Sequence, residues 1–364
     1  MHTQGKIDSS REKITILQLV TGLGVGGAER VVMEMAGRLS SQGFRTVVVV
    51  LKNDRSILAQ YPHVNFPVYC VGMSKNPWSL IKATAALIKI IRCERISLIH
   101  AHMFHALSLA LISKIVTCHL KVVFTSHSSK GFSFLRRLVI RGSKFLRAAD
   151  VIFISGQHPE MNATKTVVIP NGVSVDPGWV NSNGMMKERK VFLFVGRLEP
   201  AKNPIGLIRS FAAMKQKECE LWIAGDGFLR PDVEREIAKF HLEDRVRLLG
   251  IRRDVTKLLE EADCFVMASL WEGLPMAILE AGAVALPVVA PPVGAIPDLL
   301  GDECGYLVEP SELCHALDDI LENYAEARRR GIRLRNKVIA GFSLDHMCLA
   351  HADLYRSLFN SGMR

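Results

Sequence analysis

Two carboxylates in the second half of the chain stand where they could bind a ligand. Glu272 and Glu280 open and close the sequence EGLPMAILE, which follows an apolar strand predicted at 264–267. Gly273 and Pro275 predict a turn, with Pro275 at the first position of a helix, where proline is tolerated. The helix then offers free backbone amides to a ligand, those of Leu274, Met276 and Ala277. The alternative to ligand binding is that Glu272 is an acid favoured by the helix dipole and Glu280 is an ordinary solvated glutamate.

Two cations follow the apolar strand predicted at 191–195. Arg197 and Lys202 lie in the sequence GRLEPAKN, at the carboxyl end of that strand. A guanidinium grips two oxygens at once and an ammonium is a compact charge, so together they suit a diphosphate. The commoner alternative for such a pair is a solvated basic loop. No D-x-D sequence occurs in the chain, so we expect these cations, and no divalent metal, to neutralise the ligand.

A glycine-rich turn, GLGVGG at 22–27, separates a strand predicted at 13–20 from a helix predicted from about 28 to 41. It fits the G-x-G-x-x-G pattern of dinucleotide-binding enzymes. Those enzymes need an acid at the end of the second strand to hold a ribose, but Leu51 is followed by Lys52 and Asn53, and Asp54 comes late. Nicotinamide binding is therefore disfavoured. Amides free of side chains at a helix N-terminus still predict an approach to a diphosphate.

Three histidines fall close together in HAHMFH at 100–105. Because a strand is predicted to end there, its alternation sends neighbouring side chains to different faces, which disfavours a metal site. A structural histidine is the commonest interpretation. His102 is also a candidate for a place near an acceptor substrate.

Strands and helices alternate throughout the chain, which predicts two parallel α/β domains. Further strands are predicted at 46–51, 98–101, 122–125, 151–154, 167–169, 220–224, 246–249 and 287–290. The turn-rich stretch 174–190 predicts a linker. We expect one domain at 1–178, a second at 186–344, and a C-terminal helix at about 345–364 that packs back on the first. Ligands of such sheets bind at the carboxyl ends of the strands, so the two domains define a central cleft.

Composition supports a folded, globular protein, and the charge is distributed unevenly along the chain. Hydrophobic residues make up 49% of the 364, no apolar run reaches the ~18 residues of a spanning helix, and no signal sequence opens the chain. The eight cysteines are dispersed, so neither a zinc cluster nor a disulfide framework is indicated. Residues 1–185 hold 22 Lys and Arg against 9 Asp and Glu, whereas 186–364 hold 24 against 27. This asymmetry predicts an anionic partner for the first half.

Seven motifs in order resemble one enzyme family. They are GGAER at 26–30, TSH at 125–127, PNGV at 170–173, VGRL at 195–198 with Lys202, GDG at 225–227, the E-x7-E of Glu272 and Glu280, and GAIPD at 294–298. The chain resembles the retaining GT-B glycosyltransferases of family 4, also called glycosyl transferases group 1, of the type that builds bacterial envelope polysaccharides. The resemblance implies two Rossmann-like, doubly wound domains facing a central cleft. It also implies a nucleotide diphosphate sugar as donor.

The resemblance implies roles for individual residues. The donor diphosphate is assigned to Gly26, Gly27, Arg197 and Lys202. The ribose hydroxyls are assigned to Glu280, and the base to Ile251 within GIR at 250–252. The donor sugar is assigned to Glu272, Gly273, Leu274, Pro275 and Met276, with Gly227 also on the donor side. Catalysis is implied for His127, Glu272, Arg197 and Lys202. The stretch GAVALP after the E-x7-E and the Gly294-Ala295 pair depart from the family pattern, so the sugar itself stays open.

We expect transfer of a hexose or N-acetylhexosamine, from a UDP-sugar in preference to a GDP-sugar, to a polyprenyl-diphosphate or other lipid-linked saccharide in assembly of an O-antigen-type polysaccharide. No metal or other cofactor is expected. The alternatives are a nucleotide-sugar epimerase on the same fold and a transferase acting on a soluble acceptor. Nucleic-acid binding would explain the pI of about 9.3, but no recognition motif accompanies the charge.

A basic amphipathic segment predicts where a membrane would bind. Residues 130–147 carry six basic residues and no acid. In a helix, Leu135, Leu138, Val139 and Leu146 would share one face, with Arg137, Arg141 and Lys144 opposite. Packing on the domain core is the alternative. With Phe132 and Phe134 just before the helix, the pattern favours peripheral attachment to an anionic surface, expected to be the cytoplasmic face of the inner membrane.

Overall fold

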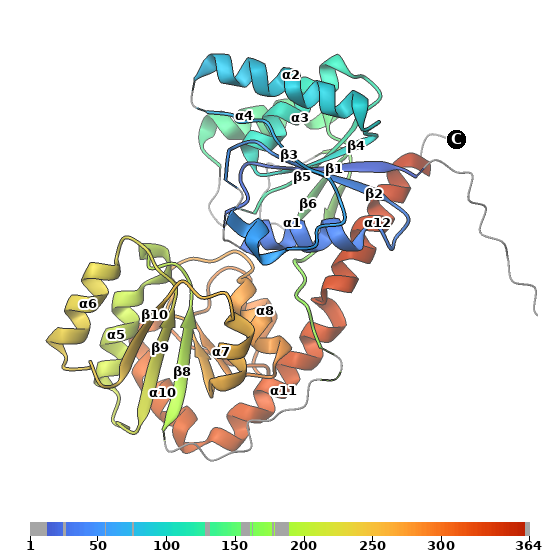
Figure 1. Cartoon of the computed structure of the whole chain (residues 1–364). Helices are drawn as coiled ribbons and strands as arrows, with labels where there is room; N and C mark the ends of the chain where they lie inside the picture. Colours follow the sequence, from blue (N-terminus) through green and yellow to red (C-terminus); the bar gives the residue numbers. More distant parts are fainter. Residues whose placement is uncertain are drawn as a thin grey trace, which may run out of the picture.

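The computed structural model describes residues 13–24, 27–54, 56–74, 76–127, 132–153, 161, 163–176, 178 and 189–360. They form two α/β units, one above the other in Figure 1. Each unit is Rossmann-like, because helices cover both faces of a parallel sheet in each. The expected GT-B architecture is confirmed.

The first unit is built on a seven-stranded parallel sheet in the order β3-β2-β1-β4-β5-β6-β7. The strands are β1 (Thr15–Val20), β2 (Arg45–Val50), β3 (Val68–Cys70), β4 (Leu98–His102), β5 (Lys121–Thr125), β6 (Ala149–Ile152) and β7 (Thr166–Val168). The helices are α1 (Gly27–Arg38), α2 (Pro77–Cys93), α3 (Phe104–Val116) and α4 (Phe134–Gly142). β1 is buried along its whole length: Leu17 and Leu19 join the core under α2 and α3, and Ile16 joins the core under α1.

The second unit has a six-stranded parallel sheet in the order β10-β9-β8-β11-β12-β13. The strands are β8 (Lys190–Val195), β9 (Cys219–Ala224), β10 (Val246–Gly250), β11 (Cys264–Val266), β12 (Val288–Ala290) and β13 (Tyr306–Leu307). The helices are α5 (Pro204–Ala213), α6 (Arg230–Lys239), α7 (Val255–Glu261), α8 (Met276–Ala283), α9 (Ile296–Leu300), α10 (Leu313–Glu322) and α11 (Tyr324–Gly341). One core lies under α7, α8 and α11 and the other under α5, α6 and α10.

The last helix, α12 (Leu344–Asn360), leaves the second unit and packs on the first, beside α1 (Figure 1). Its Met347 and Tyr355 join the core that holds Ile16 and Val31. The two crossings between units run side by side, because Val173 donates to the carbonyl of Phe342 and Leu344 donates to that of Val173. A Cβ on residue 172 would lie 2.5 Å from the Ser343 carbonyl, so the first crossing needs glycine there.

The sequence-predicted elements differ from the structure mainly at the edges. Strands β3 and β13 were not predicted, because each is short, half-buried and at the rim of its sheet. Residues 177 and 179–188, most of the expected linker, lie outside the described residues.

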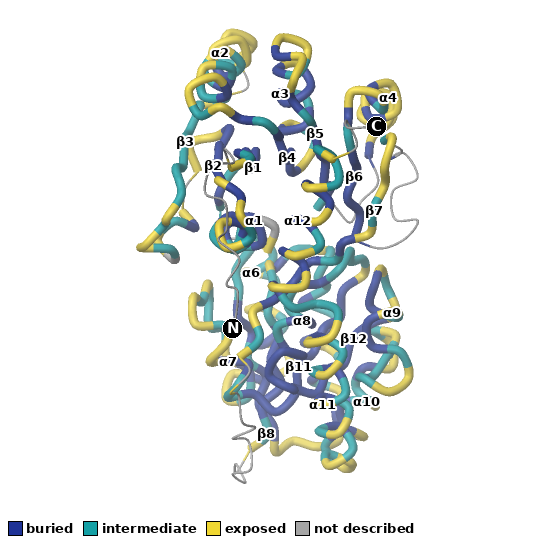
Figure 2. The backbone as a smooth tube through the Cα atoms, turned by 90° about the vertical axis from the view of Figure 1, so that its right-hand side faces the viewer, coloured by how far each residue is buried: buried dark blue, intermediate teal, exposed yellow. Residues whose placement is uncertain are grey.

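The helix expected through 146 ends at Gly142 and gives way to a 3-10 turn at Lys144–Leu146. Two residues counted toward its surface are buried. Phe132 packs in the core, and Arg147 is fully buried in a two-pronged bond to Asp150. Figure 2 shows the contrast between the exposed turns of α4 and the buried strands beneath.

Candidate functional site

Two helix N-termini, one from each unit, meet across the interface. Gly27 is the first residue of α1, and a Cβ there would lie 3.0 Å from Cγ of Met276, the first residue of α8. Pro275, expected inside the helix, is instead its N-cap residue. The first amides of a helix have no acceptor within the helix, and they carry the positive end of its dipole. Two such ends at one point favour an anion, phosphate above all.

Lys202 is paired with an acid of the loop that leads into α8. Its ammonium is 2.5 Å from Oε1 of Glu272, which also accepts a 2.7 Å hydrogen bond from Ser269. The pair is largely buried, with 23% of the lysine side chain and 8% of the glutamate side chain exposed. The Leu270 amide donates to the Ala201 carbonyl and joins the two loops. Lys202, expected to bind the diphosphate, and Glu272, expected to bind the donor sugar, are therefore bonded to each other.

The GDG turn at 225–227 packs against the backbone of the loop that carries Arg197. A Cβ on residue 225 would lie 1.9 Å from the carbonyl oxygen of Gly196, and one on residue 227 would lie 2.4 Å from that of Leu198. Gly225 also has φ of +142°, which side chains rarely adopt. Gly227, expected on the donor side, thus has a clear packing role. Arg197 itself extends outward, 73% exposed, and pairs with Glu199 at 2.6 Å.

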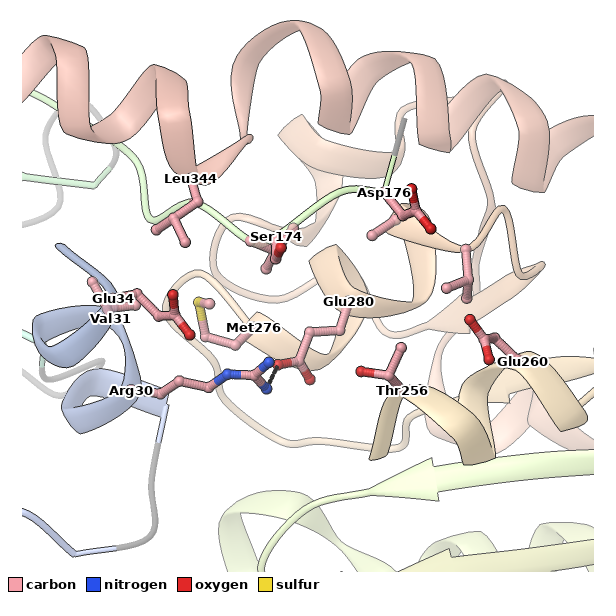
Figure 3. Close-up of a pocket in the computed structure, with 14 residues that line it drawn as sticks. Arg30, Val31, Glu34, Ser174, Asp176, Thr256, Glu260, Met276, Glu280 and Leu344 are labelled. Atoms are coloured by element: carbon pink, nitrogen blue, oxygen red, sulfur yellow. Dashed lines mark hydrogen bonds and ion pairs between the residues drawn. The ribbon is translucent and has the colours of Figure 1, made fainter. Parts of the chain in front are cut away.

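Glu280 pairs with an arginine of the other unit. Arg30 of α1 reaches across the interface to Oε1 of Glu280 at 2.7 Å. Figure 3 shows this bond beside a cavity of about 310 Å³, lined also by Glu34, Asp176 and Glu260. Burial raises the pKa of Glu280, and Arg30 opposes that rise. The sequence analysis assigned no role to Arg30. Its position in the first turn of the helix that follows the glycine-rich turn is the signal that could have indicated one.

His127 follows β5 at the carboxyl end of the sheet and is bonded to His102. Nε2 of His127 lies 2.9 Å from Nδ1 of His102, whose Nε2 lies 2.7 Å from Oε1 of Gln18. Burial holds the pKa of His127 at about 4 and that of His102 well below its usual value, so both rings are neutral at pH 7. His102 is 3% exposed, and its two ring nitrogens are bonded to Gln18 and His127.

Comparisons with known proteins agree with this geometry. A family model described as Glycosyltransferase Family 4 matches residues 25–177, and one described as Glycosyl transferases group 1 matches 189–323. The chain belongs to glycosyltransferase family 4. The two matches fall on the two units, and together they contain every motif that carried the resemblance.

Three relatives of this transferase are informative. An uncharacterized glycosyltransferase, MJ1059 of Methanocaldococcus jannaschii, is 30% identical over 60% of this chain and 62% of its own length. The Escherichia coli UDP-Gal:alpha-D-GlcNAc-diphosphoundecaprenol alpha-1,3-galactosyltransferase is 26% identical over 96% of this chain and 98% of its own. The crystal structure of Anabaena Alr3699/HepE in complex with UDP has a TM-score of 0.80 at 20% identity, covering 94% of this chain and 100% of that one.

The structure also describes other residues predicted for the site. Gly273 accepts a bond from Ala295, which braces the loop before α8. Ile251 follows Gly250 at the end of β10 and is 69% exposed, an apolar surface available to a base. Gly26 lies outside the described residues. Among the described residues, no three His, Cys, Asp or Glu side chains are grouped so that they could hold a metal ion.

The basic segment of the transferase exposes its apolar side chains as well as its charges. Only Ile140 of α4 is buried, while Phe134 is 83% exposed and Leu135 is 69% exposed. Packing on the core, the alternative for this helix, is therefore wrong for all but Ile140. No helix among the described residues is long and apolar enough to span a bilayer.

Proposed function

We propose that this transferase moves a hexose or N-acetylhexosamine from a UDP-sugar to a lipid-linked saccharide, with retention of anomeric configuration. The donor half of this proposal is supported by the convergence of the α1 and α8 N-termini, with Lys202 bonded to the loop that leads into α8. That arrangement provides backbone dipoles and a cation for a diphosphate without a metal. The bound UDP in the similar Anabaena structure supports the choice of nucleotide.

The reaction breaks the bond from the anomeric carbon to the diphosphate and forms a bond from that carbon to the acceptor oxygen, on the same face. The acceptor hydroxyl proton passes to the departing phosphate oxygen. Positive charge grows on the sugar carbon and negative charge on the leaving group, so stabilising the leaving phosphate is the main task. We assign it to Arg197, Lys202 and the two helix N-termini. Glu280 is assigned to the ribose and Glu272 to the sugar.

Binding of the donor requires an exchange of partners at both acids. Glu280 is bonded to Arg30 and Glu272 to Lys202. A diphosphate offers Lys202 a doubly charged partner in place of one carboxylate, and ribose hydroxyls can donate to Glu280. Each acid is then free to accept bonds from sugar hydroxyls. The ion pairs keep these buried charges compensated before the donor arrives.

Turnover tests these assignments. We expect Glu280→Ala and Lys202→Ala each to lower kcat/KM at least ~100-fold, because each removes a charged contact to the donor. Arg209→Ala is the matched control, since Arg209 bonds to Glu236 between α5 and α6, away from the interface. Near-normal turnover by either site variant removes that residue from the site. A panel of UDP- and GDP-sugars, scored by thermal stabilisation and by the anomeric configuration of the product, tests donor and retention.

The acceptor half rests on the exposed face of the first unit. Helices α2, α3 and α4 cover the side of its sheet that lies away from the second unit (Figure 1). Each presents a large apolar side chain to solvent: Trp78 is 71% exposed, Ile115 is 66% exposed and Phe134 is 83% exposed. Apolar side chains among many basic ones suit the interface of an anionic membrane. The E. coli relative named for a diphosphoundecaprenol substrate supports a lipid-linked acceptor.

Vesicle co-sedimentation tests this surface. Each basic residue contributes about 1 kcal/mol at an anionic membrane, so reversing Arg137, Arg141 and Lys144 to Glu should abolish binding at low salt while sparing UDP binding. The matched control reverses three exposed basic residues of the second unit, Arg235, Lys257 and Arg329. If wild-type protein does not bind such vesicles and uses water-soluble acceptors as well as lipid-linked ones, the membrane proposal is contradicted and a soluble acceptor is favoured.

A further inference from the structure

An unbranched hydrogen-bonded chain of three side chains runs through the first unit and ends at His127. It passes from Gln18 of β1 through His102 of β4 to His127, which follows β5. The last ring nitrogen, Nδ1 of His127, is buried and has no hydrogen-bond partner among the described residues. We propose that Gln18 and His102 are positioning residues that hold His127 in one tautomer, with its proton on Nε2 and a bare lone pair on Nδ1.

The sheet itself brings these residues together. Strands β1, β4 and β5 are neighbours, and Gln18 is in register with His100. Side chains two apart on a strand share a face, so His102 lies on the same face as His100, one step nearer the carboxyl end. His127 lies two residues beyond the partner of His102, Thr125. The hydrogen-bonded series Gln18–His102–His127 therefore runs toward the carboxyl ends of the strands, where ligands of such sheets bind.

The tautomer follows from counting protons. A neutral imidazole has one N–H and one lone pair, and burial keeps both rings neutral. Nε2 of His102 faces an amide oxygen, which only accepts, so the proton of His102 is on Nε2. Nδ1 of His102 is then an acceptor, and Nε2 of His127 must donate to it. Nδ1 of His127 is left with a lone pair.

The orientation of the Gln18 amide sets the direction of the whole chain. Its oxygen lies 2.7 Å from His102, and its nitrogen has no hydrogen-bond partner among the described residues. With its oxygen toward His102, the amide accepts the Nε2 proton, whereas the opposite orientation would place an N–H there and move both histidine protons to Nδ1.

The consequence for catalysis rests on the proposed function. Because Nδ1 of His127 is buried, its lone pair can accept a hydrogen bond from a sugar hydroxyl only after the side chains that cover it move aside, whereas an N–H at that atom would oppose the bond. Gln18 and His102 would act only through His127. Because the pKa of His127 is about 4, the ring acts as a hydrogen-bond acceptor and not as an acid at pH 7.

Nitrogen NMR of histidine-labelled protein tests the tautomer without any substrate. In wild-type protein, with His127 assigned by its loss in His127→Gln, we expect Nε2 to be protonated and Nδ1 to be unprotonated. A proton on Nδ1, a mixture of tautomers, or a charged ring at pH 7 overturns the proposal. This measurement does not depend on turnover, so it remains decisive if the protein transfers no sugar at all, the result that would instead refute the proposed function.

A variant with a matched control tests the role of Gln18. Gln18→Leu should give a tautomer mixture at His127 and lower kcat about 10-fold, the effect of one misdirected hydrogen bond, with little change in UDP affinity. His100→Phe is the control, because His100 is equally buried and stacks 4.2 Å from His102 but bonds to Tyr355 and Thr125 instead. It should retain the wild-type tautomer of His127. Wild-type His127 signals in folded Gln18→Leu, or equal loss of the tautomer in both variants, refute the positioning role.

Discussion

Replacing Glu272 by glutamine should tighten binding of UDP while it lowers the rate of sugar transfer. The Lys202 ammonium lies 2.5 Å from the Glu272 carboxylate. A diphosphate must compete with that carboxylate for the same cation. Glutamine keeps the size and the bond from Ser269 but removes the competing charge. The change therefore separates binding of the diphosphate from contacts to the sugar.

The size of the effect follows from the geometry. At 2.5 Å and an effective dielectric of about 20, the gross attraction is about 7 kcal/mol. Desolvation of both groups offsets most of it, and a net coupling of about 1–3 kcal/mol is typical of a partly buried pair. The fraction that opposes the ligand is smaller, about 1–2 kcal/mol, since a diphosphate does not displace Lys202 entirely from Glu272. UDP affinity should then rise about 5- to 30-fold.

Calorimetric titration with UDP measures the change, and two variants control it. Ser269→Ala removes a bond to the same carboxylate oxygen without altering charge, so UDP affinity should stay within about 2-fold. Lys202→Met should weaken UDP binding and also lower the free energy of unfolding, because it leaves Glu272 buried without its cation. If folded Glu272→Gln binds UDP no more tightly than wild type, Lys202 does not exchange partners and the pair has only a structural role.

Four further outcomes are expected. Arg30→Ala removes the group that opposes the raised pKa of Glu280. A carboxyl whose pKa is raised in the folded protein stabilises the fold less as pH rises through that pKa. The loss of Tm should therefore be larger at about pH 7.5 than at about pH 5. Equal losses at both pH values would show that the pair does not control this charge. His127→Ala should impair transfer more than UDP-sugar affinity, and calorimetry showing equal losses of both would make His127 a donor ligand only. Excess EDTA should leave turnover unchanged, whereas activity lost to EDTA and restored by Mg²⁺ or Mn²⁺ would contradict a metal-independent reaction. Gly225→Ala should lower the free energy of unfolding by about 3 kcal/mol or more, because its Cβ would meet a carbonyl oxygen. Gly301→Ala, at a residue with positive φ but open space, should lower it by about 1 kcal/mol. Similar losses for the two variants in denaturant titrations would refute the steric argument.

Local sequence determined the layout of the protein and the loops that carry its site. Runs of β-branched and aliphatic residues predicted the central strands, because such strands are buried on both faces and show as unbroken apolar stretches. The prediction that strand ends carry the site followed from the topology of parallel sheets alone. Glu272 does lie in a loop after β11, whereas Lys202 ends a short 3-10 turn that follows β8. Edge strands such as β3 lacked this signal because one rim is solvated.

Only the tertiary structure decided which of these charges are paired and which side chains are covered. Arg30 and Glu280 lie 250 positions apart, and Lys202 and Glu272 lie 70 apart. The first bond depends on two units brought together, and the second depends on the pairing of β8 with β11 in one sheet. No local pattern encodes either relation. The same holds for α4, whose amphipathic pattern is equally compatible with a helix buried on a core and one that exposes its leucines. Burial and pairing set the free energy of a charge or an apolar group, and both depend on distant segments of the chain.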